Sequence, residues 1–210
     1  MKSQEHPIFR ESIKYIRSQI GFTGLTNVQQ SVLERIIHSS GDLSMQSDLR
    51  FSSNACEEAI NALKKGANIL TDTYMAKAAV SPVAKRTLNS NVKCILEMAP
   101  EIINSSSTTR SEIGMKQMWL DMEKKEDFLA GPVVVIGSAP TALMTLLDLI
   151  QEGSKKPSLI IGMPVGFIGV SECKTRLINS DSSYIVLEGS KGGASLASAT
   201  VNALLRAAEN

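Results

Sequence analysis

The chain has 210 residues, and its 22 lysines and arginines balance 21 aspartates and glutamates, which leaves a formal net charge of +1. This length suits one layered domain over residues 1–210, with N-terminal helices over 1–40 and an α/β core over 41–210. The charge balance provides no basic field of the kind that binds nucleic acid, so nucleic acid is not expected as a partner.

The cysteines and the apolar stretches indicate the cellular compartment of the protein and whether it spans a membrane. Cys56, Cys94 and Cys173 are odd in number and far apart, which argues against a disulfide framework and against a thiolate metal site. Residues 1–7 lack the apolar core of a secretion signal, and the apolar stretch 159–170 is short and interrupted by glycine and proline. We therefore expect a reduced, cytoplasmic protein with no membrane span and no metal.

In chain order, two helices come first and strand-helix units follow. The first helix begins at Pro7 and ends at Gly21, and the second begins at Thr26 or Asn27 and ends before Gly41. Predicted strands lie at 49–51, 68–71, 92–96, 133–136, 158–161 and 184–187, and predicted helices follow at 54, 75, 109, 140, 170 and 196. Repeated units of this kind predict an α/β fold with a mostly parallel, doubly wound sheet.

His38 stands at the predicted end of the second helix, before a small polar turn. Histidine changes charge near neutral pH, and a helix C-terminus favours a cation, so an imidazole there is a candidate proton donor. The alternative interpretation is structural: the ring caps the last carbonyls of its own helix.

Open parallel sheets bind ligands at the carboxyl ends of their strands, and four of the segments there are unusual: 108–111, 137–143, 162–170 and 189–195. Residues 137–143 form a turn of small residues with Pro140 in the first helical turn, and its N–H groups could hold an anion. Residues 162–170 are rich in both glycine and apolar residues, which suits the wall of a pocket for a large flat ligand. Tight packing and helix capping are the alternative explanation for 137–143.

Cations and further glycines stand near other element ends. Residues 189–195 combine glycines that allow close backbone approach with Lys191, a positive point charge. Arg110 lies near a predicted helix N-terminus, where it can grip a carboxylate through two parallel hydrogen bonds. Arg50 and Lys77 are weaker candidates, because solvated surface cations are ordinary.

Several common catalytic motifs are missing from the sequence. It contains no G-x-S-x-G elbow, H-E-x-x-H pair or Walker loop, and Ala139 and Ala142 occupy later glycine positions of a G-x-G-x-x-G motif. Hydrolase, metalloprotease and ATPase functions are therefore disfavoured.

Six tracts together resemble the precorrin-8X methylmutase family over nearly the whole chain: RIIHSSGD at 35–42, TTRS at 108–111, GSAPTAL at 137–143, GMPVGFIG at 162–169, KGGAS at 191–195 and VNAL at 201–204. The resemblance implies a flavodoxin-like fold and an isomerase of cobalamin biosynthesis. Such an enzyme moves a methyl group from C-11 to C-12 of precorrin-8X, giving hydrogenobyrinate, or of cobalt-precorrin-8, giving cobyrinate. Ser138 departs from the family, which usually has asparagine there.

The resemblance also implies roles for individual residues. His38 would donate a proton or hydrogen bond to the ring C nitrogen. A methyl migration between neighbouring carbons needs no redox partner or metal, so no cofactor is expected. The pocket for so wide a ligand calls for a second subunit, so we expect a homo-oligomer, most simply a homodimer, with shared sites. The substrate carries acetate and propionate groups that need charge-assisted donors. The candidate substrate-binding residues are Arg50, Lys77, Thr109, Arg110, Ser111, Ser138, Ala139, Pro140, Thr141, Met163, Pro164, Val165, Gly166, Phe167, Lys191, Gly192 and Gly193.

Two alternative functions share this pocket. A non-catalytic tetrapyrrole carrier would use the same cations without needing an acid at His38. A flavin or nicotinamide protein would use the same crevice, although the sequence lacks a good phosphate fingerprint for it.

Overall fold

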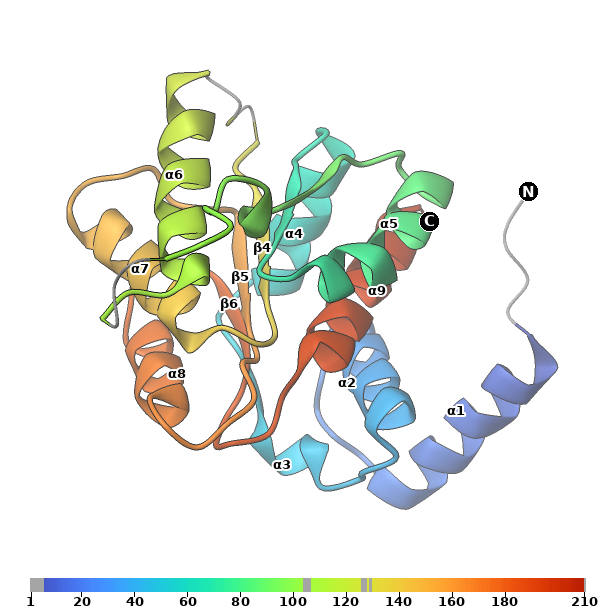
Figure 1. Cartoon of the computed structure of the whole chain (residues 1–210). Coiled ribbons are helices and arrows are strands. Elements are labelled where there is room, and N and C mark those ends of the chain that lie inside the picture. The colour runs from blue at the N-terminus through green and yellow to red at the C-terminus, as the bar shows by residue number, and fades with distance from the viewer. Residues whose placement is uncertain (1–5, 104–106, 126–127, 129, 210) are drawn as a thin grey trace.

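The computed structural model describes residues 6–103, 107–125, 128 and 130–209, and it shows a six-stranded sheet with helices on both faces (Figure 1). Residues 1–5 of the predicted N-terminal segment lie outside this description. The strands are β1 (Leu49–Phe51), β2 (Ile69–Thr71), β3 (Val92–Cys94), β4 (Val133–Ile136), β5 (Leu159–Gly162) and β6 (Tyr184–Leu187). The predicted strand 92–96 is too long, because residues 95–97 wind into a 3₁₀ turn, η1 (Ile95–Glu97).

The strand order confirms the predicted fold class. The sheet runs β1-β6-β5-β4-β2-β3, with β1 antiparallel to β6 and every other neighbouring pair parallel. Counted from β2, the five parallel strands have the order second, first, third, fourth, fifth, which is the flavodoxin-like arrangement. The point where this order reverses lies between β2 and β4.

Two helical layers cover the sheet (Figure 1). One core cluster joins the sheet to helices α2, α4, α5 and α9, and the second joins the opposite face to α6, α7 and α8. The helices are α1 (Pro7–Ile20), α2 (Asn27–Ser40), α3 (Met45–Asp48), α4 (Ala55–Lys64), α5 (Tyr74–Arg86), α6 (Arg110–Lys124), α7 (Pro140–Gln151), α8 (Val170–Ile178) and α9 (Ala194–Glu209). None of the helices in the described ranges has the length and apolarity that crossing a lipid bilayer requires.

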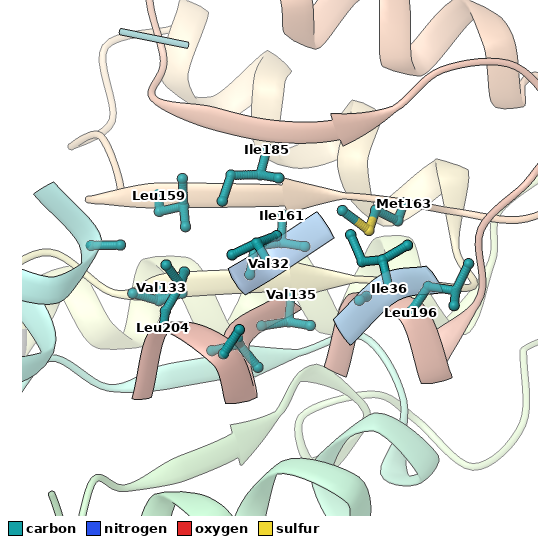
Figure 2. Packing of buried hydrophobic residues seen from close by; sticks show 14 of the residues in the cluster. Val32, Ile36, Val133, Val135, Leu159, Ile161, Met163, Ile185, Leu196 and Leu204 are labelled. Carbon is teal, nitrogen blue, oxygen red and sulfur yellow. The ribbon is translucent and has the colours of Figure 1, made fainter. Parts of the chain in front are cut away.

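The sequence of the central strands explains why both faces are covered. All four residues of β4 are buried, as expected for a β-branched run in the middle of a parallel sheet. Figure 2 shows Val133 and Val135 on one face of this strand, with Val32 of α2 and Leu204 of α9 in the same cluster. This packing fixes the position of α2, whose last turn carries His38.

The cysteines are part of this core rather than of a reactive site. Cys56, Cys94 and Cys173 are all buried and unpaired. Burial raises the pKa of the Cys56 thiol to about 12 and that of the Cys173 thiol to about 11. Both thiols are therefore protonated near neutral pH and act as small packing groups.

Helix α1 lies on α2 and extends away from the rest of the molecule (Figure 1). A bidentate ion pair joins the two helices: Arg17 donates from Nε and Nη2 to the two carboxylate oxygens of the buried Glu34, at 2.6 and 3.0 Å. Two parallel charge-assisted bonds fix orientation as well as distance. The pair therefore sets how α1 lies across the last turns of α2.

Candidate active site

The loops that follow β4, β5 and β6 are joined by backbone hydrogen bonds at the carboxyl edge of the sheet. The N–H of Val165 donates to the carbonyl of Gly137 at 3.3 Å, and the N–H of Gly193 donates to the carbonyl of Met163 at 2.9 Å. Gly192 is required by this contact, because a Cβ there would lie 2.1 Å from the carbonyl oxygen of Met163. The three loops therefore form one continuous surface.

An open depression of about 370 Å³ lies where this surface meets the end of α2. It brings together three of the predicted site residues, Val165, Lys191 and Gly192, with the residues that follow His38. Its lining is Ser39, Ser40, Asp42, Met45, Val165, Lys191, Gly192, Ser195 and Leu196.

His38 is exposed in the last turn of α2, directly before Ser39 and Ser40, which line this depression. Its Nδ1 lies 2.8 Å from the hydroxyl oxygen of Ser12, and the ring meets that of Phe9 edge to face, with centroids 4.9 Å apart. The helix end is closed by the N–H of Gly41, which donates to the carbonyl of Ile37 at 2.8 Å. His38 is thus not the cap of its helix, contrary to the structural alternative.

The hydrogen bond from α1 bears on which nitrogen carries the ring proton. When the Ser12 hydroxyl donates to Nδ1, the neutral ring carries its proton on Nε2. Within the described part of the chain, Nε2 has no hydrogen-bond partner. In that tautomer the ring has one donor available to a ligand, and its other side is held by Ser12.

Lys191 lines the depression, and its ammonium group is paired with a carboxylate of the chain. Its ammonium lies 2.8 Å from Oδ2 of Asp42 and 2.6 Å from the hydroxyl of Ser44. Hydrogen bonding to Lys191 lowers the pKa of the Asp42 carboxyl to about 2. This pair is near the surface, so a ligand carboxylate can share or replace Asp42 at modest cost.

The 137–139 turn differs from the prediction that its N–H groups could hold a ligand anion. The N–H groups of Gly137, Ser138 and Ala139 all donate to Oδ2 of Asp72, at 3.0, 2.6 and 2.9 Å. Asp72 follows β2 and is fully buried. The N–H groups of the turn thus bind a carboxyl group of the chain itself.

The Asp72 carboxyl has an unusual environment. Burial raises its pKa, and the three backbone hydrogen bonds oppose that rise because they favour the charged form. The remaining oxygen, Oδ1, is buried and has no hydrogen-bond partner among the residues that the structure describes. Asp72 thus fixes the turn after β4 to the end of β2, at the point where the strand order reverses.

The residues at the start of α6 lie apart from the depression. Thr109 caps α6 in a capping box with Glu112, and its hydroxyl lies 2.8 Å from that of Thr141 at the start of α7. The side chain of Arg110 is exposed and donates from Nε to the carbonyl of Pro100 at 2.9 Å. Ser111 is half-buried in the same turn, and neither it nor Arg110 lines the depression.

Arg50 and Lys77 are both engaged in surface ion pairs. Arg50 on β1 lies 2.6 Å from Glu188, and Lys77 on α5 pairs with Glu97. Neither lines the depression. This arrangement agrees with the alternative that both are ordinary surface cations.

The glycine-rich tract after β5 is divided between core and surface. The side chains of Met163 and Pro164 are buried, and Met163 belongs to the core cluster in Figure 2, so neither presents a side chain to the depression. Phe167 and Ile168 are 89% and 90% exposed, and Val165 lines the depression. An apolar group of this kind marks an interaction surface.

The sequence interpretation missed the three charged groups that organise the loops: Asp42, Asp72 and Lys174. Asp72 directly follows a buried strand at its carboxyl end, which is a recognisable position for a functional polar residue. Lys174 falls on the buried stripe of α8 with Cys173 and Leu177, where a lysine is unexpected. Both signals are local, but the partners of the two residues are distant in sequence.

The sheet order and the histidine at its carboxyl edge define an α/β protein of the flavodoxin-like class with a candidate small-molecule site at that edge. A family model described as precorrin-8X methylmutase (CbiC) matches residues 7–207. The chain therefore belongs to the precorrin-8X methylmutase family, as the six tracts predict, and it is an isomerase of cobalamin biosynthesis.

Individual relatives agree with this assignment. The chain is 36% identical to a precorrin-8X methylmutase of Pseudomonas aeruginosa, over 94% of this chain and 93% of the relative. It is 34% identical to a cobalt-precorrin-8 methylmutase of Synechocystis, over 96% and 95% of the two chains. A crystal structure of precorrin-8X methylmutase from Thermus thermophilus matches with a TM-score of 0.84 at 33% identity, covering 96% of this chain and 95% of that one.

Proposed function

We propose that this chain, acting as a single domain in the cytoplasm, moves a methyl group from C-11 to C-12 of precorrin-8X or its cobalt form, with His38 as proton donor to the ring C nitrogen. The observation that carries the proposal is the placement of His38. One ring nitrogen is held by Ser12, the other has no partner in the described ranges, and the two residues that follow His38, Ser39 and Ser40, line the depression.

The reaction needs little more from the protein than this donor. The bond from the methyl carbon to C-11 breaks as the bond to C-12 forms, so the shift is internally balanced and needs no external nucleophile or oxidant. What the enzyme must supply is the reactive tautomer, and a donor at the ring C nitrogen draws electrons in the required direction. A positioned general acid contributes a factor of about 10²–10⁴ in rate, or roughly 3–5.5 kcal/mol.

The remaining predicted residues then serve binding. Lys191, with Gly192 and Gly193 beside it, offers a cation at the depression, and Val165, Gly166 and Phe167 offer an apolar wall. Arg110, with Thr109 and Ser111, stands at the start of α6 as the donor for a more distant carboxylate. The backbone N–H groups of 137–139 already donate to Asp72. Ser138, Pro140 and Thr141 would therefore contact the substrate through their side chains.

We further propose a homo-oligomer, most simply a homodimer, whose copies complete each other's sites. The depression is open and small for a substituted macrocycle, which favours a wall from a second copy. Exposed apolar side chains support this: Ile8 and Tyr15 stand seven residues apart on α1, and Phe22 beyond it is 98% exposed. Sedimentation of the purified chain tests the assembly, and a monomer at micromolar concentration contradicts it.

The test of the function is turnover. Purified protein is incubated with precorrin-8X and separately with cobalt-precorrin-8, and the visible spectrum is followed with time. Formation of hydrogenobyrinate or cobyrinate supports the proposal. A spectral change that reports binding without product supports the carrier alternative instead. Bound flavin, or a melting temperature raised by nicotinamide nucleotides, indicates the dinucleotide-binding alternative.

A further inference from the structure

Lys174 on α8 is a buried lysine that the proposed reaction does not use. Its side chain is 1% exposed and lies in the helix face that also buries Val170, Cys173 and Leu177. An ammonium group buried among such residues costs several kcal/mol unless its N–H groups find good acceptors. The hydrogen-bond acceptors of the Lys174 ammonium therefore indicate which part of the structure this residue stabilises.

Both acceptors belong to the loop after β6. Nζ of Lys174 donates to the carbonyl oxygen of Gly189 at 2.8 Å and to that of Lys191 at 2.7 Å. Burial lowers the pKa of the ammonium to about 8, and attraction to the carboxylate of Asp48 at the end of α3 opposes that fall. The group is therefore still charged near neutral pH, and charged donors make the stronger hydrogen bonds.

This contact holds Lys191 from two sides. The buried Lys174 binds the carbonyl oxygen of Lys191, while Asp42 and Ser44 bind its ammonium group at the surface. The loop is further held by the N–H of Gly193, which donates to Met163, and by the carbonyl of Ser190, which accepts from Gly166 at 3.1 Å. The backbone of Lys191 is thus placed from beneath, independently of whatever its side chain binds.

We propose that Lys174 is a positioning residue for substrate binding: its buried ammonium holds the carbonyl groups of the 189–191 loop so that Lys191 presents its own ammonium at the depression beside His38. This inference rests on the proposed function and deepens it. Lys174 does not touch the substrate and acts through Lys191. It should therefore govern the affinity for the tetrapyrrole carboxylates rather than the rate of the methyl shift.

The test is a double-mutant cycle on ligand affinity. The dissociation constant of hydrogenobyrinate is measured by visible titration for the unaltered protein, Lys174→Met, Lys191→Ala and the double variant. Each single change is expected to weaken binding by about tenfold, the effect of losing one charge-assisted contact. The double variant is expected to bind no more weakly than Lys191→Ala, because groups that act as a unit are not additive.

Kinetics and controls separate positioning from a general loss of structure. In Lys174→Met, KM is expected to rise while kcat stays within about threefold, the pattern of lost uniform binding. Lys174→Arg keeps a buried charged donor and is expected to recover part of the affinity. Lys64→Met removes an exposed lysine at the far end of α4 and is expected to change nothing. Unchanged affinity in Lys174→Met, or fully additive losses in the double variant, overturns the proposal.

A ligand-free measurement keeps the inference testable by itself. The amide of Gly166 donates to the carbonyl of Ser190 in the loop, and the amide of Gly193 donates to the carbonyl of Met163. Hydrogen exchange of these two amides is compared between the unaltered protein and Lys174→Met. Lys174→Gln is used if the first variant does not fold. Exchange is expected to accelerate by about tenfold or more. Unchanged exchange overturns the role of Lys174. If the unaltered protein binds no tetrapyrrole but exchange does accelerate in Lys174→Met, the proposed function is wrong. The contact of Lys174 with the loop is then still supported.

Discussion

The carboxyl edge of the sheet has a closed centre and an open flank. At the centre, where the strand order reverses between β2 and β4, the buried Asp72 takes up three backbone N–H groups of the 137–139 turn. At the flank, the end of α2 and the loops after β5 and β6 surround a depression, with His38 and Lys191 at the surface.

The comparison shows that the usual ligand position of this fold class is occupied here by the chain itself. Ligands of open α/β sheets commonly bind where the strand order reverses, and backbone N–H groups there commonly bind anions. In this protein the same feature stabilises the centre, and the proposed proton donor His38 and the cation of Lys191 stand at the flank. The following experiments test this division, from the largest expected effect to the smallest.

Replacing His38 should affect chemistry at the flank alone. His38→Ala is expected to lower kcat by a factor of about 10²–10⁴, because the proton donor is lost. Its affinity for hydrogenobyrinate and its melting temperature should stay close to those of the unaltered protein. His6→Asn, which alters the other histidine and keeps a capping side chain on α1, is the control. Full turnover in His38→Ala removes this residue from the mechanism.

Replacing Asp72 should affect stability at the centre. Asp72→Ala leaves three N–H groups without their acceptor, and the free energy of unfolding is expected to fall by about 3 kcal/mol. Urea denaturation measures the loss. Asp121→Ala, which removes the half-buried i,i+4 partner of the exposed Lys125, should cost about 0.5 kcal/mol or less. An unchanged urea midpoint for Asp72→Ala contradicts the structural role of the closed centre.

Arg110 tests whether the start of α6 takes part in binding although it lies outside the depression. Arg110→Ala is expected to weaken tetrapyrrole binding by about tenfold without unfolding the protein, because a charged donor to a substrate carboxylate is lost. Arg86→Ala, at the exposed end of α5, is the matched control. Equal affinities for the two variants at low and at moderate salt remove Arg110 from the site.

Ser12 tests whether α1 orients the catalytic ring. Ser12→Ala removes a neutral hydrogen bond to Nδ1 of His38, and kcat is expected to fall by about two- to tenfold with affinity unchanged. Ser18 on the same helix donates to the carbonyl of Tyr15 and accepts from Nε2 of Gln19, both on α1 itself, so Ser18→Ala serves as the comparison. A kcat for Ser12→Ala equal to that of Ser18→Ala contradicts the orienting role.

The Asp42–Lys191 pair makes a smaller, pH-dependent contribution. The pKa of Asp42 is lowered to about 2 in the folded protein, below its ordinary value of 3.8. A carboxyl group with a depressed folded pKa stabilises the fold above its unfolded pKa and loses that effect as the pH falls. The stability advantage over Asp42→Asn is therefore expected at pH 5 and should shrink between about pH 4 and pH 2. An advantage that is constant over this range contradicts the ion pair.

Local patterns predicted the fold and part of the site. The buried run 133–136 and the glycine and capping residues around α2 correctly predicted their elements, and the strand-helix alternation predicted the parallel sheet. The position of His38 at the end of a helix followed from Gly41. These features depend on neighbours within a few residues, and the chemistry of those neighbours is visible in the sequence.

The internal partners of the site could not be predicted in this way. Asp72 and the 137–139 turn are more than sixty residues apart, and Asp42 and Lys191 are separated by 149. Free N–H groups at a strand end look the same in sequence whether a ligand or a buried carboxylate satisfies them. The pairing of β2 with β4 brings Asp72 beside the 137–139 turn, and this contact is visible only in the folded structure.

The most direct measurement of the central claim is a crystal structure of the protein with bound hydrogenobyrinate. The account predicts Nε2 of His38 within about 2.7–3.2 Å of the ring C nitrogen, with the macrocycle over the depression at the flank. A pigment seated over the 137–139 turn, with the imidazole remote from every ring nitrogen, would contradict it.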